Sequence, residues 1–318
     1  MFLESFKITA QAMAQIAILG FLGYFLVKIK LLSEEALRAL SRLVISVIFP
    51  VLIFTQLIKK FSFSLYPDWW IYPLISIAIM GAGFLLGGAL STFVSGAERK
   101  NQFLSLVAFQ NSGYLPLALV AALLRGPQLD TMLIYLFLVL LGFDLVMWSF
   151  GVYILAHEKT GRFHFGSLFS PPVIANIASL SMIALGLNSF VPGVVLKPLE
   201  MVAGCTLPLA MFIVGGNIAL IRLEQVDRLS IVLISLAKLI IMPAAGLALV
   251  FWLNAPELIG LMVIMQLAMP SATSCSVIIR YSNKEDILVS QGVFFTHILS
   301  LITIPVFLSL YFSLRMVK

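Results

Sequence analysis

The chain has 318 residues, of which 61% are hydrophobic and only 11% are charged, and its formal net charge is +6. An ordinary soluble domain carries about 25% charged residues, and this much apolar side chain cannot be kept from water in a protein of this size. A soluble enzyme, a disordered chain, a coiled coil and a disulfide scaffold are therefore excluded. The composition indicates an all-α polytopic membrane protein, because lipid cannot satisfy an open strand edge.

Ten apolar runs follow one another along the chain, and each matches the roughly 20 residues that a helix needs to cross a bilayer. The first run ends at Lys28 and Lys30 rather than at a small-residue cleavage site, so we expect a retained span and not a signal peptide. The predicted spans cover residues 8–27, 37–58, 69–94, 101–124, 130–156, 171–189, 196–221, 229–252, 257–281 and 287–314.

The basic residues predict the orientation of these spans. Ten spans put both termini on one side, which holds seven of the 20 basic residues, whereas twelve lie on the opposite side and Lys238 lies inside a span. The richer side is expected to be cytoplasmic, so we predict a multi-pass plasma-membrane protein with both termini outside the cytoplasm. The basic residues are too scattered to neutralise a phosphate backbone, so no nucleic-acid partner is expected.

Similar short segments occur in the two halves of the chain, and the two members of each pair are separated by nearly the same number of residues. Because five is an odd number, a second five-span copy must enter the membrane from the opposite side, which gives an inverted repeat of the kind common in secondary transporters. We divide the chain into repeats at 1–157 and 171–318, joined by a short cytoplasmic linker at 158–170. The matching pairs are Pro50 with Pro208, Pro116 with Pro270, and residues 74–78 with 233–237.

The fourth and ninth spans each carry a proline beside a polar cluster near the middle. Proline removes a backbone donor and clashes with the preceding turn, so Pro116 and Pro270 are expected to break these helices. The freed backbone groups are tolerated in a membrane only if protein, ligand or water satisfies them. The alternative is that each proline makes a packed kink.

A break would place the start of a second half-helix near the middle of the bilayer in both spans. Each helix start contributes roughly half a positive charge, and two such ends that face one cavity form an anion site. The expected substrate-binding residues are Asn111, Ser112, Gly113, Tyr114, Pro116, Gln266, Pro270, Ser271, Thr273 and Ser274.

Three ionisable residues inside spans are candidates for ion or proton coupling. Asp144 is either a proton or cation site or part of a structural pair, because an unpartnered acid at this depth costs several kcal/mol. Lys238 either snorkels toward water, neutralises a substrate carboxylate, or pairs with Asp144. His297 is expected chiefly as a hydrogen-bonded packing residue. Cys205 and Cys275 lack CxxC spacing, so no metal and no cofactor is expected beyond a coupling ion, H⁺ or Na⁺.

Several motifs resemble the auxin efflux carrier family, which includes plant PIN carriers and prokaryotic malonate and malate permeases. The resemblance covers nearly the whole chain and is most specific in the fourth and seventh spans. Ser170 departs from the family, which has Asn at this point in an Asn-Pro opening of the sixth span. The matching segments are 20–32, 43–54, 110–117, 170–176, 207–216 and 269–272, with the later Tyr281.

The resemblance implies ten helices in two inverted repeats, with broken helices 4 and 9 that cross. Helices 1, 2, 6 and 7 would form a scaffold, and helices 3–5 and 8–10 a transport domain that carries organic anions, mainly carboxylates, by an elevator movement. The partners implied are a small organic anion and the lipid bilayer, with a homodimer left open. The short linker differs from the long cytoplasmic loop of plant carriers and favours a prokaryotic permease.

We therefore predict a secondary transporter of small organic anions. The alternative is a sodium-coupled carrier of a larger, steroid-like or amphipathic anion. An enzyme is not expected, because the chain has no HExxH, no GxSxG and no paired aspartate motif. A channel is disfavoured because rings of like charge are absent.

Overall fold

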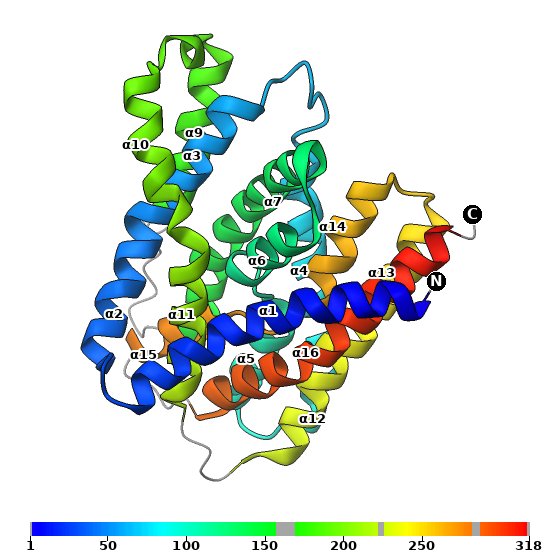
Figure 1. Ribbon diagram of the computed structural model, residues 1–318. Helices are drawn as coiled ribbons and strands as arrows, with labels where there is room; N and C mark the ends of the chain where they lie inside the picture. The colour runs from blue at the N-terminus through cyan, green and yellow to red at the C-terminus, as the bar shows by residue number, and fades with distance from the viewer. Residues whose placement is uncertain (1, 157–168, 222–225, 282–286, 317–318) are drawn as a thin grey trace.

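The computed structural model describes residues 2–156, 169–221, 226–281 and 287–316, and within these ranges every regular element is a helix (Figure 1). Seven helices are long and apolar enough to cross a bilayer, which shows a polytopic membrane protein. Most of the linker predicted at 158–170 lies outside the described residues. The seven helices are Phe2–Lys28, Glu34–Lys60, Ile71–Phe93, Gly126–Leu155, Gly193–Ala219, Arg228–Trp252 and Ile287–Arg315.

The first half of the chain contains helices with local irregularities at three points. A π-helical turn separates α2 from α3, another separates α7 from α8, and a non-helical stretch separates α5 from α6. The elements are α1 (Phe2–Lys28), α2 (Glu34–Leu43), η1 (Val44–Ile48), α3 (Phe49–Lys60), α4 (Ile71–Leu90), η2 (Ser91–Phe93), α5 (Ala97–Ala108), α6 (Tyr114–Leu123), α7 (Gly126–Val146), η3 (Met147–Gly151) and α8 (Val152–Ala156).

The described part of the second half has a π-helical turn between α12 and α13 and a non-helical stretch between α14 and α15. The elements are α9 (Pro171–Ala184), η5 (Leu187–Phe190), α10 (Gly193–Gly204), α11 (Thr206–Ala219), α12 (Arg228–Leu236), η6 (Ala237–Ile241), α13 (Met242–Trp252), α14 (Glu257–Ala268), α15 (Thr273–Tyr281) and α16 (Ile287–Met316).

Prolines mark the places where the long helices deviate. Pro50 is the second residue of α3, directly after the π-helical turn η1, and Pro208 lies in the first turn of α11 after the interruption at Cys205. Proline has no N–H to donate to the preceding turn, so the backbone there adopts another hydrogen-bonding pattern. The sequence predicts kinks at Pro50 and Pro208, and both prolines lie directly after an irregularity in their helices.

The sixth predicted span is shorter than expected. Helix α9 ends at Ala184, where Gly186 adopts a left-handed conformation with φ of +69° and a short 3₁₀ turn follows. Fourteen helical residues rise about 21 Å, which is less than the roughly 30 Å of a hydrocarbon core. The prediction of a helix over residues 171–189 was therefore too long, because hydropathy does not register the flexibility of Gly186.

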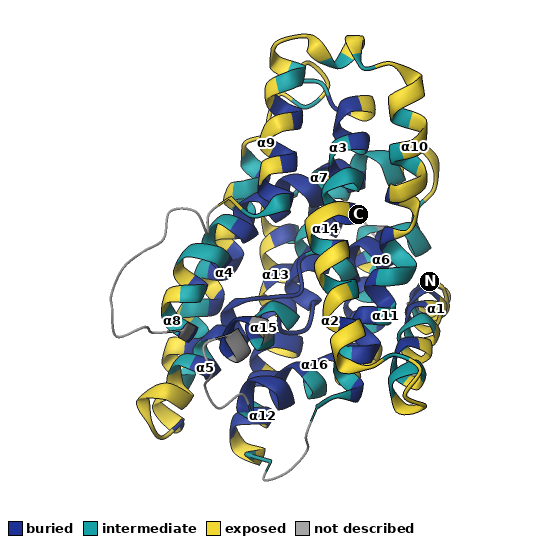
Figure 2. Cartoon of the chain, turned by 90° about the vertical axis from the view of Figure 1, so that its left-hand side faces the viewer, coloured by how far each residue is buried: buried dark blue, intermediate teal, exposed yellow. Residues whose placement is uncertain are grey.

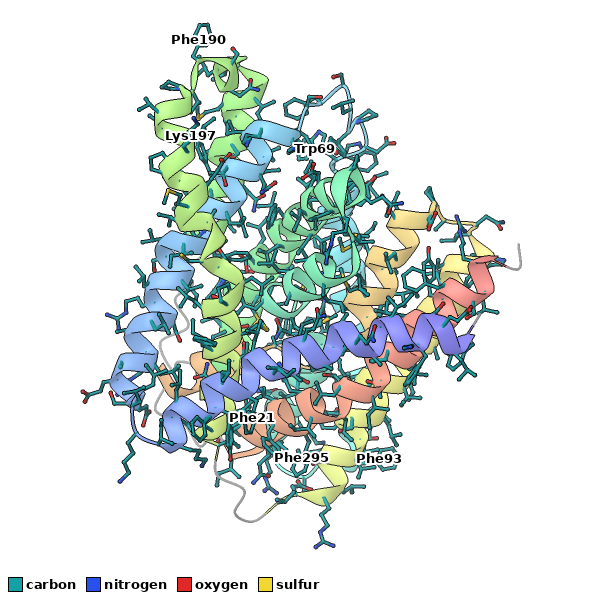
Figure 3. All side chains as sticks on the ribbon, viewed as in Figure 1. Phe21, Trp69, Phe93, Phe190, Lys197 and Phe295 are labelled. Atoms are coloured by element: carbon teal, nitrogen blue, oxygen red, sulfur yellow. The ribbon has the colours of Figure 1, made fainter. Side chains whose placement is uncertain are left out.

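The outer surface of the bundle is apolar. Figure 2 shows exposed residues along α1, α9 and α10, whereas the central helices α6, α7 and α15 are largely buried. Among the exposed side chains are Phe93 and Phe190, which lie on the outside of the bundle in Figure 3 with 64% and 79% of their surface accessible. An apolar exterior of this extent fits a surface covered by lipid.

Both ends of the chain lie at the same end of the bundle. The first turns of α1 pack on the last turns of α16, where the Thr9 and Ser309 hydroxyl oxygens are 3.0 Å apart. The Thr9 hydroxyl also reaches the carbonyl oxygens of Ser5 and Pro305. The first and last helices therefore lie next to each other near the two ends of the chain.

Glycines allow some helices to approach one another at backbone distance. A methyl group at Gly83 of α4 would lie 2.7 Å from the Cα atom of Ala108 in α5, whereas one at Gly81 of the same helix meets nothing within 4 Å. We expect Gly83→Ala to lower the free energy of unfolding by about 1–2 kcal/mol, since overpacking costs about 1–3 kcal/mol. Gly81→Ala is the matched control and should raise it by up to about 1 kcal/mol through helix propensity.

Thermal unfolding of the two variants in the same detergent measures this difference. Equal melting temperatures for Gly81→Ala and Gly83→Ala would contradict the close packing of α4 on α5.

Candidate functional site

The two interrupted segments pair with each other at their breaks. Helix α5 ends at Ala108 and α6 begins at Tyr114, while α14 ends at Ala268 and α15 begins at Thr273. An antiparallel bridge joins Gln110 to Ser271. The freed backbone groups of one break thus find partners in the other, which makes non-helical backbone tolerable at this depth.

Two backbone hydrogen bonds form the bridge. The Asn111 N–H donates to the Pro270 carbonyl oxygen at 2.8 Å, and the Ala272 N–H donates to the Phe109 carbonyl oxygen at 2.9 Å. Both helices are broken rather than kinked, so the packed-kink alternative is wrong for these prolines. Pro116 lies in the first turn of α6 as expected, whereas Pro270 lies three residues before α15, where its carbonyl serves the bridge.

The carbonyl end of α5 is also satisfied by side chains. The Ser271 hydroxyl donates to the Leu106 carbonyl oxygen at 2.7 Å, and the Lys238 ammonium donates to the Val107 carbonyl oxygen at 3.1 Å. The last carbonyls of a helix have no partner within it and carry a partial negative charge. A cation and a hydroxyl group from the second half of the chain therefore cap this end of α5.

The structure contradicts two of the three roles that the sequence left open for Lys238. Its side chain is fully buried, so it does not snorkel toward water. It donates to Val107, while Asp144 accepts from Ser170, and no ion pair joins Lys238 to Asp144 in the described part of the chain. Lys238 is not among the described residues that line the polar cavity beside the breaks, and in this structure it caps the end of α5.

A polar cavity of about 130 Å³ lies beside the crossing of the two breaks. Seven of the residues predicted from sequence line it, together with helices α2, α7, α9 and α11. The seven are Asn111, Ser112, Gly113, Tyr114, Asp144, Thr273 and Ser274.

The other predicted site residues are close to the crossing but do not line this cavity. Three of them, Pro116, Pro270 and Ser271, are buried in the protein near the crossing. Gln266 is fully buried in the last turn of α14, where its amide nitrogen lies 3.5 Å from the Ser112 carbonyl oxygen. Pro270, Ser271 and Gln266 each form a hydrogen bond that joins the two interrupted segments.

Several buried polar atoms of residues that line the cavity lack a hydrogen-bond partner among the described residues. They are both side-chain polar atoms of Gln110, the hydroxyl oxygen of Ser112 and the hydroxyl oxygen of Tyr114. Gln110 is fully buried and Ser112 nearly so. A buried polar group without a partner costs free energy, and such groups occur where a ligand or water completes the bonds.

Sequence reasoning missed some of the cavity wall. Gln110 was recognised only as part of the polar cluster, and Ser41, Trp148, Ser170 and Asn217 also line the cavity. Asn217 stands out as a polar residue in an apolar span. Nothing in its local sequence shows which neighbour it faces, because that depends on how α11 packs against the breaks.

Asp144 lies between two helices. Its carboxylate, only 6% exposed, accepts a hydrogen bond of 3.4 Å from the Ser170 hydroxyl, and the side chain of Trp148 is its other hydrogen-bonding neighbour. The Ser170 hydroxyl oxygen also accepts from the Val173 N–H at the start of α9. Asp144 on α7 is thus connected to the N-terminus of α9.

His297 on α16 contacts both the polar cavity and a second, apolar one. Its Nε2 atom lies 3.2 Å from the Asn111 amide nitrogen, and its Nδ1 atom lies 2.8 Å from the Val293 carbonyl oxygen. A neutral ring with the proton on Nδ1 satisfies both contacts, since it donates to Val293 and accepts from Asn111. This agrees with the expected hydrogen-bonded packing role.

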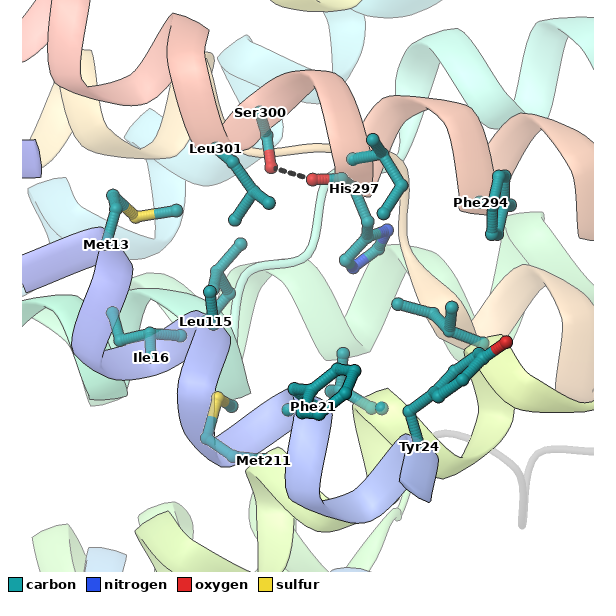
Figure 4. Close-up of a pocket in the computed structure, with 16 residues that line it drawn as sticks. Met13, Ile16, Phe21, Tyr24, Leu115, Met211, Phe294, His297, Ser300 and Leu301 are labelled. Carbon is teal, nitrogen blue, oxygen red and sulfur yellow. Dashed lines mark hydrogen bonds between the residues drawn. The ribbon is translucent and has the colours of Figure 1, made fainter. Parts of the chain in front are cut away.

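The second cavity is larger, about 510 Å³, and lies between α1, α11 and α16 (Figure 4). Met13, Leu115 and Met211 contribute to its mostly apolar wall. Ser300 also lines it, but its hydroxyl donates to the His297 carbonyl oxygen at 2.7 Å. This cavity offers room for an apolar group but few donors for an anion.

Comparison with known proteins extends over nearly the whole chain. A family model described as "Membrane transport protein" matches residues 8–166 and 157–308. A relative from Methanothermobacter thermautotrophicus, described as an uncharacterized transporter, is 26% identical over 311 residues. That alignment covers 93% of this chain and 96% of the relative, so the similarity extends over nearly the full length of both proteins.

Proposed function

Because the chain belongs to the membrane transport protein family of the auxin efflux carrier type, we propose that it is a secondary active transporter of small organic anions, mainly carboxylates. The observation that carries this proposal is the set of unpartnered polar atoms on the small cavity beside the two breaks. The oxygen atoms of an anion would accept hydrogen bonds from the hydroxyl groups of Ser112 and Tyr114 and from the side-chain amide of Gln110.

The starts of α6 and α15 add to the attraction for an anion. The first N–H groups of a helix have no partner within it, and the helix dipole makes that end positive. Tyr114 and Thr273, which begin these helices, both line the cavity. Because the cavity encloses only about 130 Å³, a substrate with a few carbon atoms fits it better than a large one.

We further propose that the chain forms ten spans in two inverted repeats, with an elevator movement of one helix group against the other. Helix α1 packs on α11, and α3 packs on α9 and α10, which supports a scaffold of spans 1, 2, 6 and 7. Helix α4 packs on α5 and α7, and α16 packs on α12 and α14, which supports a transport domain. The matching order of breaks in the two halves supports the repeat.

Gln110→Leu tests the anion site. The substitution replaces a buried amide that lacks partners with an apolar side chain of similar size, so we expect the empty protein to gain about 1–3 kcal/mol of stability. The same change removes anion contacts, so the affinity for carboxylates should fall at least tenfold. Melting temperatures with and without acetate, malonate and succinate measure both effects, since a bound ligand stabilises the folded state.

Gln56→Leu on α3, outside the cavity wall, is the matched control and should leave the carboxylate response unchanged. A Gln110→Leu protein that responds to carboxylates as strongly as the unaltered protein would refute the site.

The second cavity favours one other candidate, a sodium-coupled carrier of a larger amphipathic anion. The apolar space of about 510 Å³ meets the polar cavity at the contact between His297 and Asn111, so a long anion could place its charge at Asn111 and its apolar body beside Leu115. Uptake of cholate that requires sodium, with no uptake of malonate, would favour this candidate over the first.

A further inference from the structure

The polar cavity contains a carboxyl group at the place where an anion would bind. Asp144 lines the same small cavity as Asn111 and Thr273, and it is almost fully buried. No Lys, Arg or His is among the described residues of the cavity wall, and His297 lies behind the wall in contact with Asn111. A negatively charged substrate and an ionised Asp144 would therefore share a confined space without a cation between them.

Repulsion between two such charges is large. Two like unit charges about 5 Å apart, at an effective dielectric constant of about 20, lower the affinity by roughly three hundredfold. Donors from Ser112 and the starts of α6 and α15 attract the anion, but they attract the Asp144 carboxylate equally. An anion therefore binds well only when Asp144 carries a proton and is neutral.

The groups that face Asp144 leave it as the main titrating site of the cavity. Tyr114 on α6 is the other titratable side chain on the described wall. The other helices contribute side chains that do not titrate in this pH range. These are Phe49 on α3, Ser170 before α9, Asn217 on α11 and Thr273 on α15. Helices α4 and α14 also pack on α7 but contribute no residue to the cavity wall.

Asp144 also connects the two helix groups. Its hydrogen bond from Ser170 joins α7 to the N-terminal cap of α9, and in the proposed arrangement these helices belong to the transport domain and the scaffold. An ionised carboxylate at the start of α9 is held by that positive end, whereas a neutral carboxyl group is held less strongly. Protonation would therefore weaken the contact that must break when the domain moves.

We propose that Asp144 is the coupling site of the transporter and that each substrate anion crosses together with one proton bound to the Asp144 carboxyl group. This inference rests on the proposed function and adds its coupling ion. The proton binds to a carboxylate oxygen of Asp144 from the side on which the anion enters. It leaves on the other side after the anion has departed, and Asp144 accepts the hydrogen bond from Ser170 again once the domain has returned.

The test uses the full chain reconstituted in lipid vesicles, with radiolabelled malonate as the probe. The unaltered protein should accumulate malonate at least tenfold more when the outside is at pH 6.5 and the inside at pH 8.5 than when both are at pH 8.5. Asp144→Asn should lose this stimulation, because an amide cannot bind and release the proton. Asp130→Asn, at the exposed end of the same helix, is the matched control and should keep it.

A second measurement uses the unaltered protein, so its result does not depend on whether a variant folds. A pH-sensitive dye inside vesicles with the unaltered protein should report acidification when malonate enters, beyond that of protein-free vesicles. Asp144→Glu, which keeps a carboxyl group, should retain part of the stimulation.

Two results separate the failure of this inference from that of the proposed function. If the unaltered protein exchanges malonate but the pH gradient drives no accumulation, or if Asp144→Asn keeps the full stimulation, proton coupling at Asp144 is refuted and the carrier stands. If the unaltered protein exchanges no carboxylate at all, the proposed function fails and the inference falls with it.

Discussion

Replacing Ser274 by Asp should weaken carboxylate binding at least a hundredfold, which corresponds to about 2.7 kcal/mol. Ser274 is the second residue of α15 and lines the polar cavity. An aspartate there places a fixed negative charge on the positive end of the helix, which stabilises the helix but occupies the donors that a substrate would use. The variant should therefore fold normally while it repels the substrate.

Ser274→Asn separates charge from size. Asparagine is almost the same shape as aspartate but neutral, so its effect on affinity should stay below about tenfold, in the range of one neutral hydrogen bond. Radiolabelled malonate binding to purified protein measures both variants. Equal losses for Asp and Asn would show that the pocket responds to bulk alone and would contradict an electrostatic anion site.

Lys238→Glu should be the most damaging substitution for stability. The side chain is fully buried and donates to the Val107 carbonyl oxygen at the negative end of α5. A carboxylate at this place is repelled by the carbonyl. If it binds a proton instead, keeping a carboxyl group with an ordinary pKa near 4.3 neutral at pH 7 costs about 4 kcal/mol. This is a large part of the 5–15 kcal/mol of a typical domain.

Lys238→Met is the control for this charge effect. It keeps an unbranched stem of similar volume and removes the buried cation, and replacing a buried charged group by an apolar one is often neutral or stabilising. We expect its stability to lie within about 2 kcal/mol of the unaltered protein. Size-exclusion profiles and melting temperatures in detergent measure the two variants.

The damage from Lys238→Glu should also be smaller at pH 5 than at pH 8, because the protonated carboxyl group is neutral and can donate to Val107 as the lysine does. A Lys238→Glu protein as stable as the unaltered one at pH 8 would mean that water reaches this site.

Patterns that are local in sequence predicted much of this protein. The apolar runs identify the helices, because a bilayer demands about 20 consecutive apolar residues wherever they occur. The prolines identify the breaks at Pro116 and Pro270 and the irregular turns before Pro50 and Pro208, because proline acts on its own turn. The polar residues beside the breaks pointed to the cavity for the same reason, since an apolar span tolerates them only where they are needed.

The tertiary structure decided which of these residues face each other. Asn111 and Pro270 are far apart in sequence yet share a hydrogen bond, and no local pattern shows that Lys238 reaches Val107 rather than Asp144. A side chain's partner depends on the rotation and depth of two packed helices. A shift of one residue turns an α-helical side chain by about 100°, so a small change in packing decides whether a side chain lines the cavity, as Thr273 does, or faces another neighbour.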